Sequence, residues 1–102
     1  MSDPYLSIVV PLFNEEQNVE PLVRELEGVL GGLEYASEVI LVDDGSNDAT
    51  FNVARELCDE FDNLSVVRLR RNFGQTPAMV AGIQLGRGQV LLTIDGDLQH
   101  DP

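Results

Sequence analysis

Four short apolar runs rich in β-branched residues alternate with three segments of helical period, and this alternation constrains the fold of the chain most. The runs are YLSIVV (5–10), EVILV (38–42), SVVRL (65–69) and VLLTI (90–94). Between them, apolar residues recur at spacings of three and four, as in Val19, Leu22 and Leu26. Continuous apolar strands alternating with helices predict a parallel sheet with helices on both faces. The expected fold is a Rossmann-like α/β half sheet, β-α-β-α-β-α-β, in a single domain over residues 1–102.

The helix boundaries follow from capping signals. The second helix follows the sequence DGSND, where Ser46 and Asp48 are the expected caps. For the third helix, Thr76 is the expected N-cap, Pro77 the first helical residue and Gly86 the end. Because this third segment is apolar nearly all round, it is expected to be deeply buried.

The charge of the chain argues against several classes of partner. Eighteen acidic residues face six basic ones, all arginine, so the formal net charge is -12. Such a surface repels nucleic-acid backbones and anionic lipid headgroups. The N-terminus lacks a basic region, and Pro11 interrupts its apolar run, so we expect neither a signal peptide nor a membrane span. The single cysteine forms no internal disulfide, and a cytoplasmic location is expected.

The loops that follow the four strands carry the functional signal. In open parallel sheets, ligands bind beyond the carboxyl ends of the strands, where the strand order reverses. These loops read PLFNEE, DDGSND, RRNFGQT and DGDLQH, in chain order. All four are polar, and each contains more than a plain turn requires.

The last of these loops is a candidate metal site. Asp95 and Asp97 are separated only by Gly96, and a divalent cation would relieve the repulsion between the two carboxylates. Gln99 and His100 are further candidate ligands, and this oxygen-rich set suits Mg²⁺ or Mn²⁺. Taken alone, Asp-Gly-Asp is more typical of a simple turn that ends a strand, and its position at the ligand edge of the sheet makes the two interpretations about equal.

Two other loops offer contacts to a nucleotide. Asp44 is placed to hydrogen-bond a base or a ribose, while the neighbouring Ser46 and Asp48 need only cap a helix. Arg70 and Arg71 are the only clustered positive charges on this acidic chain. They either face a diphosphate or pair with surface carboxylates.

Read together, SIVVPLFNEEQNV, VILVDDGSNDAT, RNFGQTPAMVAGI and LLTIDGDLQHDP resemble the inverting glycosyltransferases of family 2, which have the GT-A fold. The likeness is greatest to enzymes that move a sugar from a nucleotide to a polyprenyl phosphate. It implies a UDP- or GDP-sugar donor, a polyprenyl phosphate acceptor and a DXD motif at Asp95 and Asp97. The implied nucleotide-sugar-binding residues are Pro11, Phe13, Glu15, Val42, Asp44, Arg71, Asp95 and Gly96. The implied metal ligands are Asp95, Asp97 and Gln99.

The resemblance covers only the donor-binding part of such enzymes. Relatives often have alanine where this chain has Gly96, and proline where it has Asp101. The catalytic base, the acceptor half and any membrane helices are expected downstream, so we expect a fragment without turnover of its own. The full-length protein is expected at the cytoplasmic face of the membrane. An uncovered sheet edge and apolar surface would favour self-association of the fragment.

Two alternatives from other functional classes remain at this stage. Receiver-like phosphoacceptor domains also combine a doubly wound sheet with clustered aspartates and Mg²⁺. They cluster their acids after the first strand and use a lysine, whereas this chain contains no lysine. The other alternative is a non-catalytic module whose acidic loops bind a protein partner.

Overall fold

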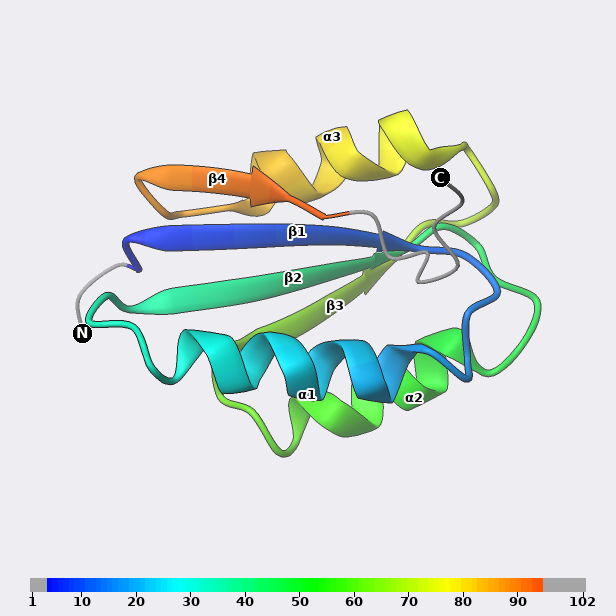
Figure 1. Cartoon of the computed structure of the whole chain (residues 1–102). Coiled ribbons are helices and arrows are strands. Elements are labelled where there is room, and N and C mark those ends of the chain that lie inside the picture. The colour runs from blue at the N-terminus through cyan, green and yellow to red at the C-terminus, as the bar shows by residue number, and fades with distance from the viewer. Residues whose placement is uncertain (1–3, 95–102) are drawn as a thin grey trace, which may run out of the picture.

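The expected alternation of strands and helices is confirmed in the computed structural model, which describes residues 4–94 (Figure 1). The strands are β1 (Leu6–Leu12), β2 (Ser37–Asp43), β3 (Leu64–Arg68) and β4 (Val90–Thr93). The helices are α1 (Val19–Leu30), α2 (Thr50–Cys58) and α3 (Gln75–Leu85). Each helix connects two successive strands, as the sequence pattern predicts.

The four strands form one parallel sheet in the order β3-β2-β1-β4. Val9 of β1 lies opposite Ile40 of β2 on one side and Thr93 of β4 on the other. Strands β2 and β3 are added in turn on one side of β1, and β4 is then added on the opposite side of β1. The strand order therefore reverses between β1 and β4, and ligands of such sheets bind beside a point of this kind.

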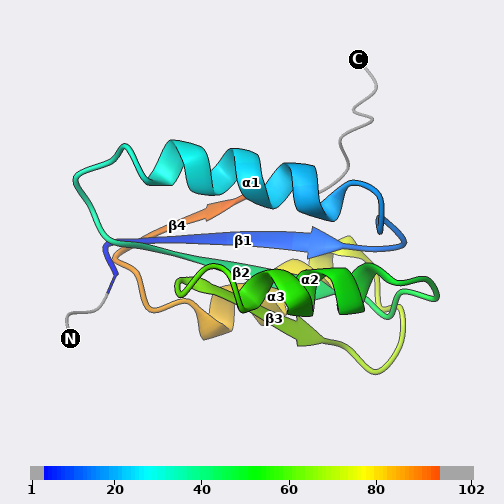
Figure 2. The ribbon, with the colours of Figure 1, turned by 90° about the horizontal axis from the view of Figure 1, so that it is seen from below.

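Helices cover both faces of the sheet, with α1 and α2 on one side and α3 on the other (Figures 1 and 2). Along β1, Ile8, Val10 and Leu12 pack into the core beneath α1 and α2. The intervening Val9 belongs to a second core cluster with Ala78 of α3. Because side chains alternate between the faces of a strand, two covered faces require apolar residues at consecutive positions. This explains the unbroken apolar runs in the sequence.

The predicted deep burial of the third helix was wrong. Only Ala78 and Gly82 of α3 are buried, whereas Val80 is 46% and Leu85 51% exposed. The helix also begins at Gln75, with Gly74 as its N-cap, rather than after Thr76. One face of α3 rests on the sheet, and no other helix or strand among residues 4–94 covers the opposite face.

The strand β4 forms one edge of the sheet and pairs only with β1 among the described residues. Its apolar side chains Val90, Leu91 and Leu92 are exposed, with Leu92 at 48%. The expected uncovered edge and apolar surface are therefore present in the described part of the chain. Within this part, no helix has the length and apolar character needed to span a membrane.

Candidate functional site

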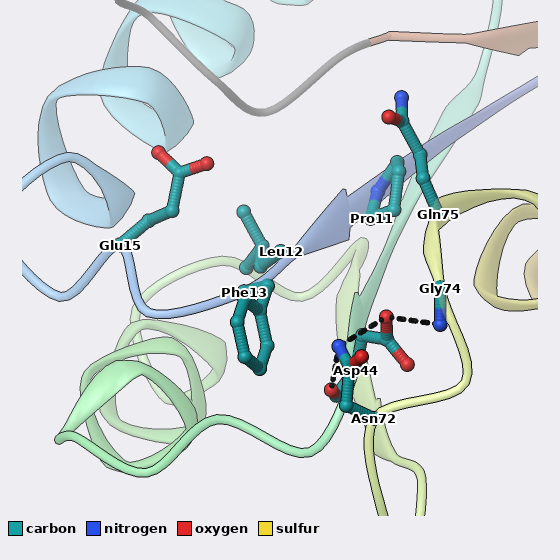
Figure 3. Close-up of a pocket in the computed structure, with 8 residues that line it drawn as sticks. All are labelled: Pro11, Leu12, Phe13, Glu15, Asp44, Asn72, Gly74 and Gln75. Carbon is teal, nitrogen blue, oxygen red and sulfur yellow. Dashed lines mark hydrogen bonds between the residues drawn. The ribbon is translucent and has the colours of Figure 1, made fainter.

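A pocket of about 270 Å³ lies at the carboxyl edge of the sheet (Figure 3). Three loops form its walls: those that follow β1, β2 and β3. Its lining residues are Pro11, Leu12, Phe13, Glu15, Asp44, Asn72, Gly74 and Gln75. Because β1 borders the reversal of strand order, the pocket lies where ligands of open α/β sheets bind.

The loops after β1 and β2 are held together by hydrogen bonds between backbone and side chains. The amide of Asn14 donates to Ser46 Oγ at 2.8 Å, and the amide of Asn47 donates in return to Asn14 Oδ1 at 2.8 Å. The amide of Glu15 donates to Thr50 Oγ1 at 2.8 Å. Asn14 adopts a positive φ of 51°, which asparagine tolerates better than most residues. These bonds fix the wall of the pocket that carries Glu15.

The start of α2 differs from the prediction. Ala49 is the N-cap residue, and the amide of Thr50 donates to Asp48 Oδ1 at 2.9 Å. Burial alone would raise the pKa of Asp48, but the hydrogen bonds from Thr50 and from a backbone amide outweigh it and lower the pKa. The expected cap at Ser46 was wrong, because its hydroxyl bonds the loop after β1 instead.

Asp44 connects the end of β2 to the loop between β3 and α3. Its Oδ1 accepts the amide of Phe73 at 2.8 Å. Its Oδ2 accepts the amide of Gly74 at 2.9 Å and Asn72 Nδ2 at 3.0 Å (Figure 3). The residue is only 3% exposed, so these donors replace most of the water that a free carboxylate would bind. Asp44 therefore both lines the pocket and orders the opposite loop.

Two glycines permit this close approach of the loops. Gly45 has a φ of +73°, and a Cβ there would lie 2.4 Å from the carbonyl carbon of Arg71. Gly74 has a φ of +105°, a conformation that residues with a side chain rarely adopt. The turn after β2 therefore contacts the β3–α3 loop through bare backbone.

The two predicted arginines lie beside the pocket rather than in its lining. The guanidinium of Arg71 stacks over the ring of Phe73 at 4.8 Å. Together with Arg70, these residues line an adjoining hollow of about 480 Å³. Within residues 4–94, neither arginine forms an ion pair with a carboxylate. Their positive charges thus stand at the rim of the site.

The remaining predicted residues fall in different places. Val42 is fully buried in the core beside Ala78 and is absent from the pocket lining. Phe13 is on the pocket wall and 41% exposed. The lining residues that sequence reasoning missed are Leu12, Asn72, Gly74 and Gln75. The signal for the last three was their position in RRNFGQT, a polar loop that follows a strand.

The predicted metal loop, Asp95, Gly96, Asp97 and Gln99, lies outside the described residues. The last described residue, Ile94, donates its amide to the carbonyl of Val9 at 2.9 Å. Within residues 4–94, no group of three or more His, Cys, Asp or Glu side chains is arranged to hold a metal ion.

Residues 7–102 match the family model of Glycosyl transferase family 2. The chain belongs to this family. It is 53% identical over 98 residues to the dodecaprenyl-phosphate galacturonate synthase of Rhizobium johnstonii. It is 41% identical over 99 residues to the undecaprenyl-phosphate 4-deoxy-4-formamido-L-arabinose transferase of Pseudomonas fluorescens. These alignments cover 95% and 96% of the chain, but the chain spans only 29% of each relative.

Solved structures of glycosyltransferases share the fold. Residues 1–349 of S. aureus TarS in complex with UDP-GlcNAc match with a TM-score of 0.77 and 26% identity, over 90% of this chain and 26% of that TarS chain. The mannosyltransferase PcManGT of Pyrobaculum calidifontis, in complex with GDP-Man and Mn²⁺, matches with a TM-score of 0.73 and 24% identity. That match covers 94% of this chain and 28% of PcManGT. The GT-A type of fold is therefore confirmed, and the family match favours the glycosyltransferase hypothesis over both alternatives.

Proposed function

We propose that residues 1–102 are the donor-binding part of a glycosyltransferase that moves a sugar from a nucleoside diphosphate to a polyprenyl phosphate, with inversion. One observation carries the proposal. Pro11, Phe13, Glu15 and Asp44, chosen from sequence motifs, line a single pocket at the ligand edge of the sheet. The ends of β1 and β2, which are far apart in the sequence but paired in the sheet, supply these residues to one pocket.

The lining residues have distinct roles in this proposal. Asp44 accepts a hydrogen bond from the base, because a buried carboxylate offers only acceptors. Phe13 supplies an apolar surface against the nucleoside. Arg71 offers its charge to the diphosphate from the rim of the pocket. Val42 acts from the core, by supporting the end of β2. The complexes of TarS with UDP-GlcNAc and of PcManGT with GDP-Man support a nucleoside diphosphate sugar as the donor.

We assign a divalent metal, Mg²⁺ or Mn²⁺, to Asp95, Asp97 and Gln99. Two carboxylates and an amide oxygen form the oxygen-rich ligand set that these ions prefer. The Mn²⁺ in the PcManGT complex is consistent with this assignment. The metal, when bound, supplies positive charge that neutralises the departing nucleoside diphosphate.

The acceptor and the location are proposed for the longer protein. The two curated relatives act, by name, on dodecaprenyl phosphate and undecaprenyl phosphate, so we propose a polyprenyl phosphate acceptor. Such an acceptor is a membrane lipid, which suggests that the protein works at the cytoplasmic face of a membrane. Because the chain spans 29% of these relatives, we expect it to bind the donor without transferring the sugar.

Calorimetric titration with UDP and with GDP, each with Mn²⁺, with Mg²⁺ and with EDTA, tests this proposal. We expect binding of one nucleotide that requires the metal and is lost in Asp97→Ala. The matched control is Asp59→Ala, which removes the same charge from an exposed position at the end of α2.

The results also decide between the parts of the proposal. Equal binding by Asp97→Ala and Asp59→Ala would refute the metal assignment. The absence of nucleotide binding under all conditions would count against a donor site in this chain. Sugar transfer to a polyprenyl phosphate by residues 1–102 alone would refute the restriction to donor binding.

A further inference from the structure

We propose that Asn72 is a positioning residue for nucleotide binding, which acts by fixing the carboxylate of Asp44. The inference rests on the proposed function, because it names a residue that makes that donor site competent. Asn72 comes from the β3–α3 loop and Asp44 from the end of β2, so the pair joins two walls of the pocket (Figure 3).

The Asp44 carboxylate is nearly saturated by donors of a single loop. A carboxylate has about four sites that accept hydrogen bonds. Three are filled: the amide of Phe73 on Oδ1, and the amide of Gly74 with Asn72 Nδ2 on Oδ2. A rotation of the carboxylate would break all three bonds at once. Its orientation is therefore determined, and about one acceptor site, on Oδ1, is left for the base of a nucleotide.

Asn72 is the one side chain among these three donors. The amides of Phe73 and Gly74 belong to the backbone and persist after any substitution that preserves the loop. Asn72 Nδ2 also lies 3.2 Å from the carbonyl oxygen of Asp44, so it contacts both the main chain and the side chain of that residue. Its removal would leave Oδ2 with the Gly74 amide alone.

The backbone geometry around the pair is suited to this contact. A Cβ at Gly45 would lie 2.6 Å from the amide nitrogen of Asn72, so only glycine allows the loop to come so close. The same loop contributes Gly74 and Gln75 to the pocket lining. Loss of the Asn72 amide would therefore loosen both Asp44 and the wall opposite Phe13. Hydrogen bonds to charged groups are stronger than neutral ones, so this effect is measurable.

The test compares Asn72→Ala with Asn52→Ala, the same change at an exposed position of α2. UDP and GDP are titrated in the presence of Mn²⁺, urea unfolding is followed for each variant, and amide exchange is measured by NMR. Asn72→Ala should bind nucleotide about tenfold more weakly than the wild type, in proportion to one lost hydrogen bond to a charged group. The amides of Phe73 and Gly74 should exchange faster, and the urea midpoint should fall only by the amount expected for that one hydrogen bond.

A second variant, Asn72→Asp, keeps the shape of the side chain but places a carboxylate against Asp44. Because like charges repel, it should bind nucleotide more weakly than Asn72→Ala. Unchanged affinity in both variants would overturn the proposal. A loss of affinity that is fully accounted for by the unfolded fraction of each variant would also overturn it, since Asn72 would then be structural only.

Failure of the inference is distinguishable from failure of the proposed function. If the wild-type chain binds neither nucleotide, the proposed donor site fails, and amide exchange alone decides the inference. Equal exchange rates at Phe73 and Gly74 in wild type and Asn72→Ala would then overturn it. Faster exchange confined to these two amides would support the fixing of Asp44 by Asn72.

Discussion

Replacement of Gly82 by alanine tests how closely α3 packs on the sheet. A Cβ at Gly82 would lie 2.3 Å from Cγ1 of Val9 and 2.9 Å from Cγ2 of Val42. Both valines are fully buried in central strands, so neither can move aside without disturbing the core. The added methyl group must therefore push α3 away from the sheet or distort the two strands.

The magnitude follows from two opposing terms. Overpacking of a core by one methyl group costs roughly 1–3 kcal/mol. Alanine is favoured over glycine inside a helix by about 1 kcal/mol, which offsets part of this cost. Gly82→Ala should thus lower the free energy of unfolding by up to about 2 kcal/mol. In contrast, a Cβ at Gly28 of α1 meets no atom within 4 Å, so Gly28→Ala keeps only the favourable term.

Urea denaturation followed by circular dichroism measures both variants. We expect opposite signs, with a lower midpoint for Gly82→Ala and a higher midpoint for Gly28→Ala. The comparison removes helix propensity, because the same substitution is made in the interior of two helices. Equal stabilisation by both variants would refute the close approach of α3 to the sheet and, with it, the reason for glycine at position 82.

Three other predictions concern different parts of the molecule. Burial alone would raise the pKa of Glu38, but hydrogen bonds, the first from the amide of Arg87, outweigh it and lower the pKa below its ordinary value. The stability from Glu38 is therefore present above the ordinary pKa of a glutamate and is lost as the pH falls through the lowered value, so Glu38→Gln should weaken the acid dependence of urea unfolding. We expect self-association through the β4 edge, so sedimentation velocity should show fewer dimers for Leu92→Glu than for Val29→Glu, which alters an exposed site on α1. Gly45→Ala should lower both stability and nucleotide affinity, because its Cβ would lie 2.4 Å from loop backbone; unchanged calorimetric affinity would contradict this.

The order of elements could be predicted because burial of a strand or helix determines the spacing of its apolar residues in the sequence. β1 and β2 are covered on both faces, and consecutive apolar residues follow from that. Asp44 was identified because it follows a strand, where the fold forms its ligand edge, whereas Pro11, Phe13 and Glu15 were implied by the resemblance to family 2 glycosyltransferases. The topology thus brings motifs far apart in the sequence to one place.

The partners of these residues could not be predicted in the same way. The bonds from Asp44 to residues 72–74 span about thirty positions, and no periodic pattern encodes such pairs. The Ser46 hydroxyl was able either to cap α2 or to bond the loop after β1, and in the structure it accepts the amide of Asn14. For α3, apolar composition predicted burial, but exposure depends on which segments cover the outer face. Local patterns carry no information about that.

Electrostatics supports the proposal that a metal takes part in the donor site. The ionisable residues of the pocket lining, within the described part of the chain, are Glu15 and Asp44, both acidic. A diphosphate would meet like charges there on a chain of net charge -12. The sequence from 63 to 94 has no acidic residue and holds four of the six arginines, which makes the β3–α3 loop the least repulsive approach. Arg71 is nevertheless exposed, so water and salt screen its attraction. We therefore propose that positive charge close to the diphosphate comes from a cation held by Asp95 and Asp97, which a single glycine separates in the sequence.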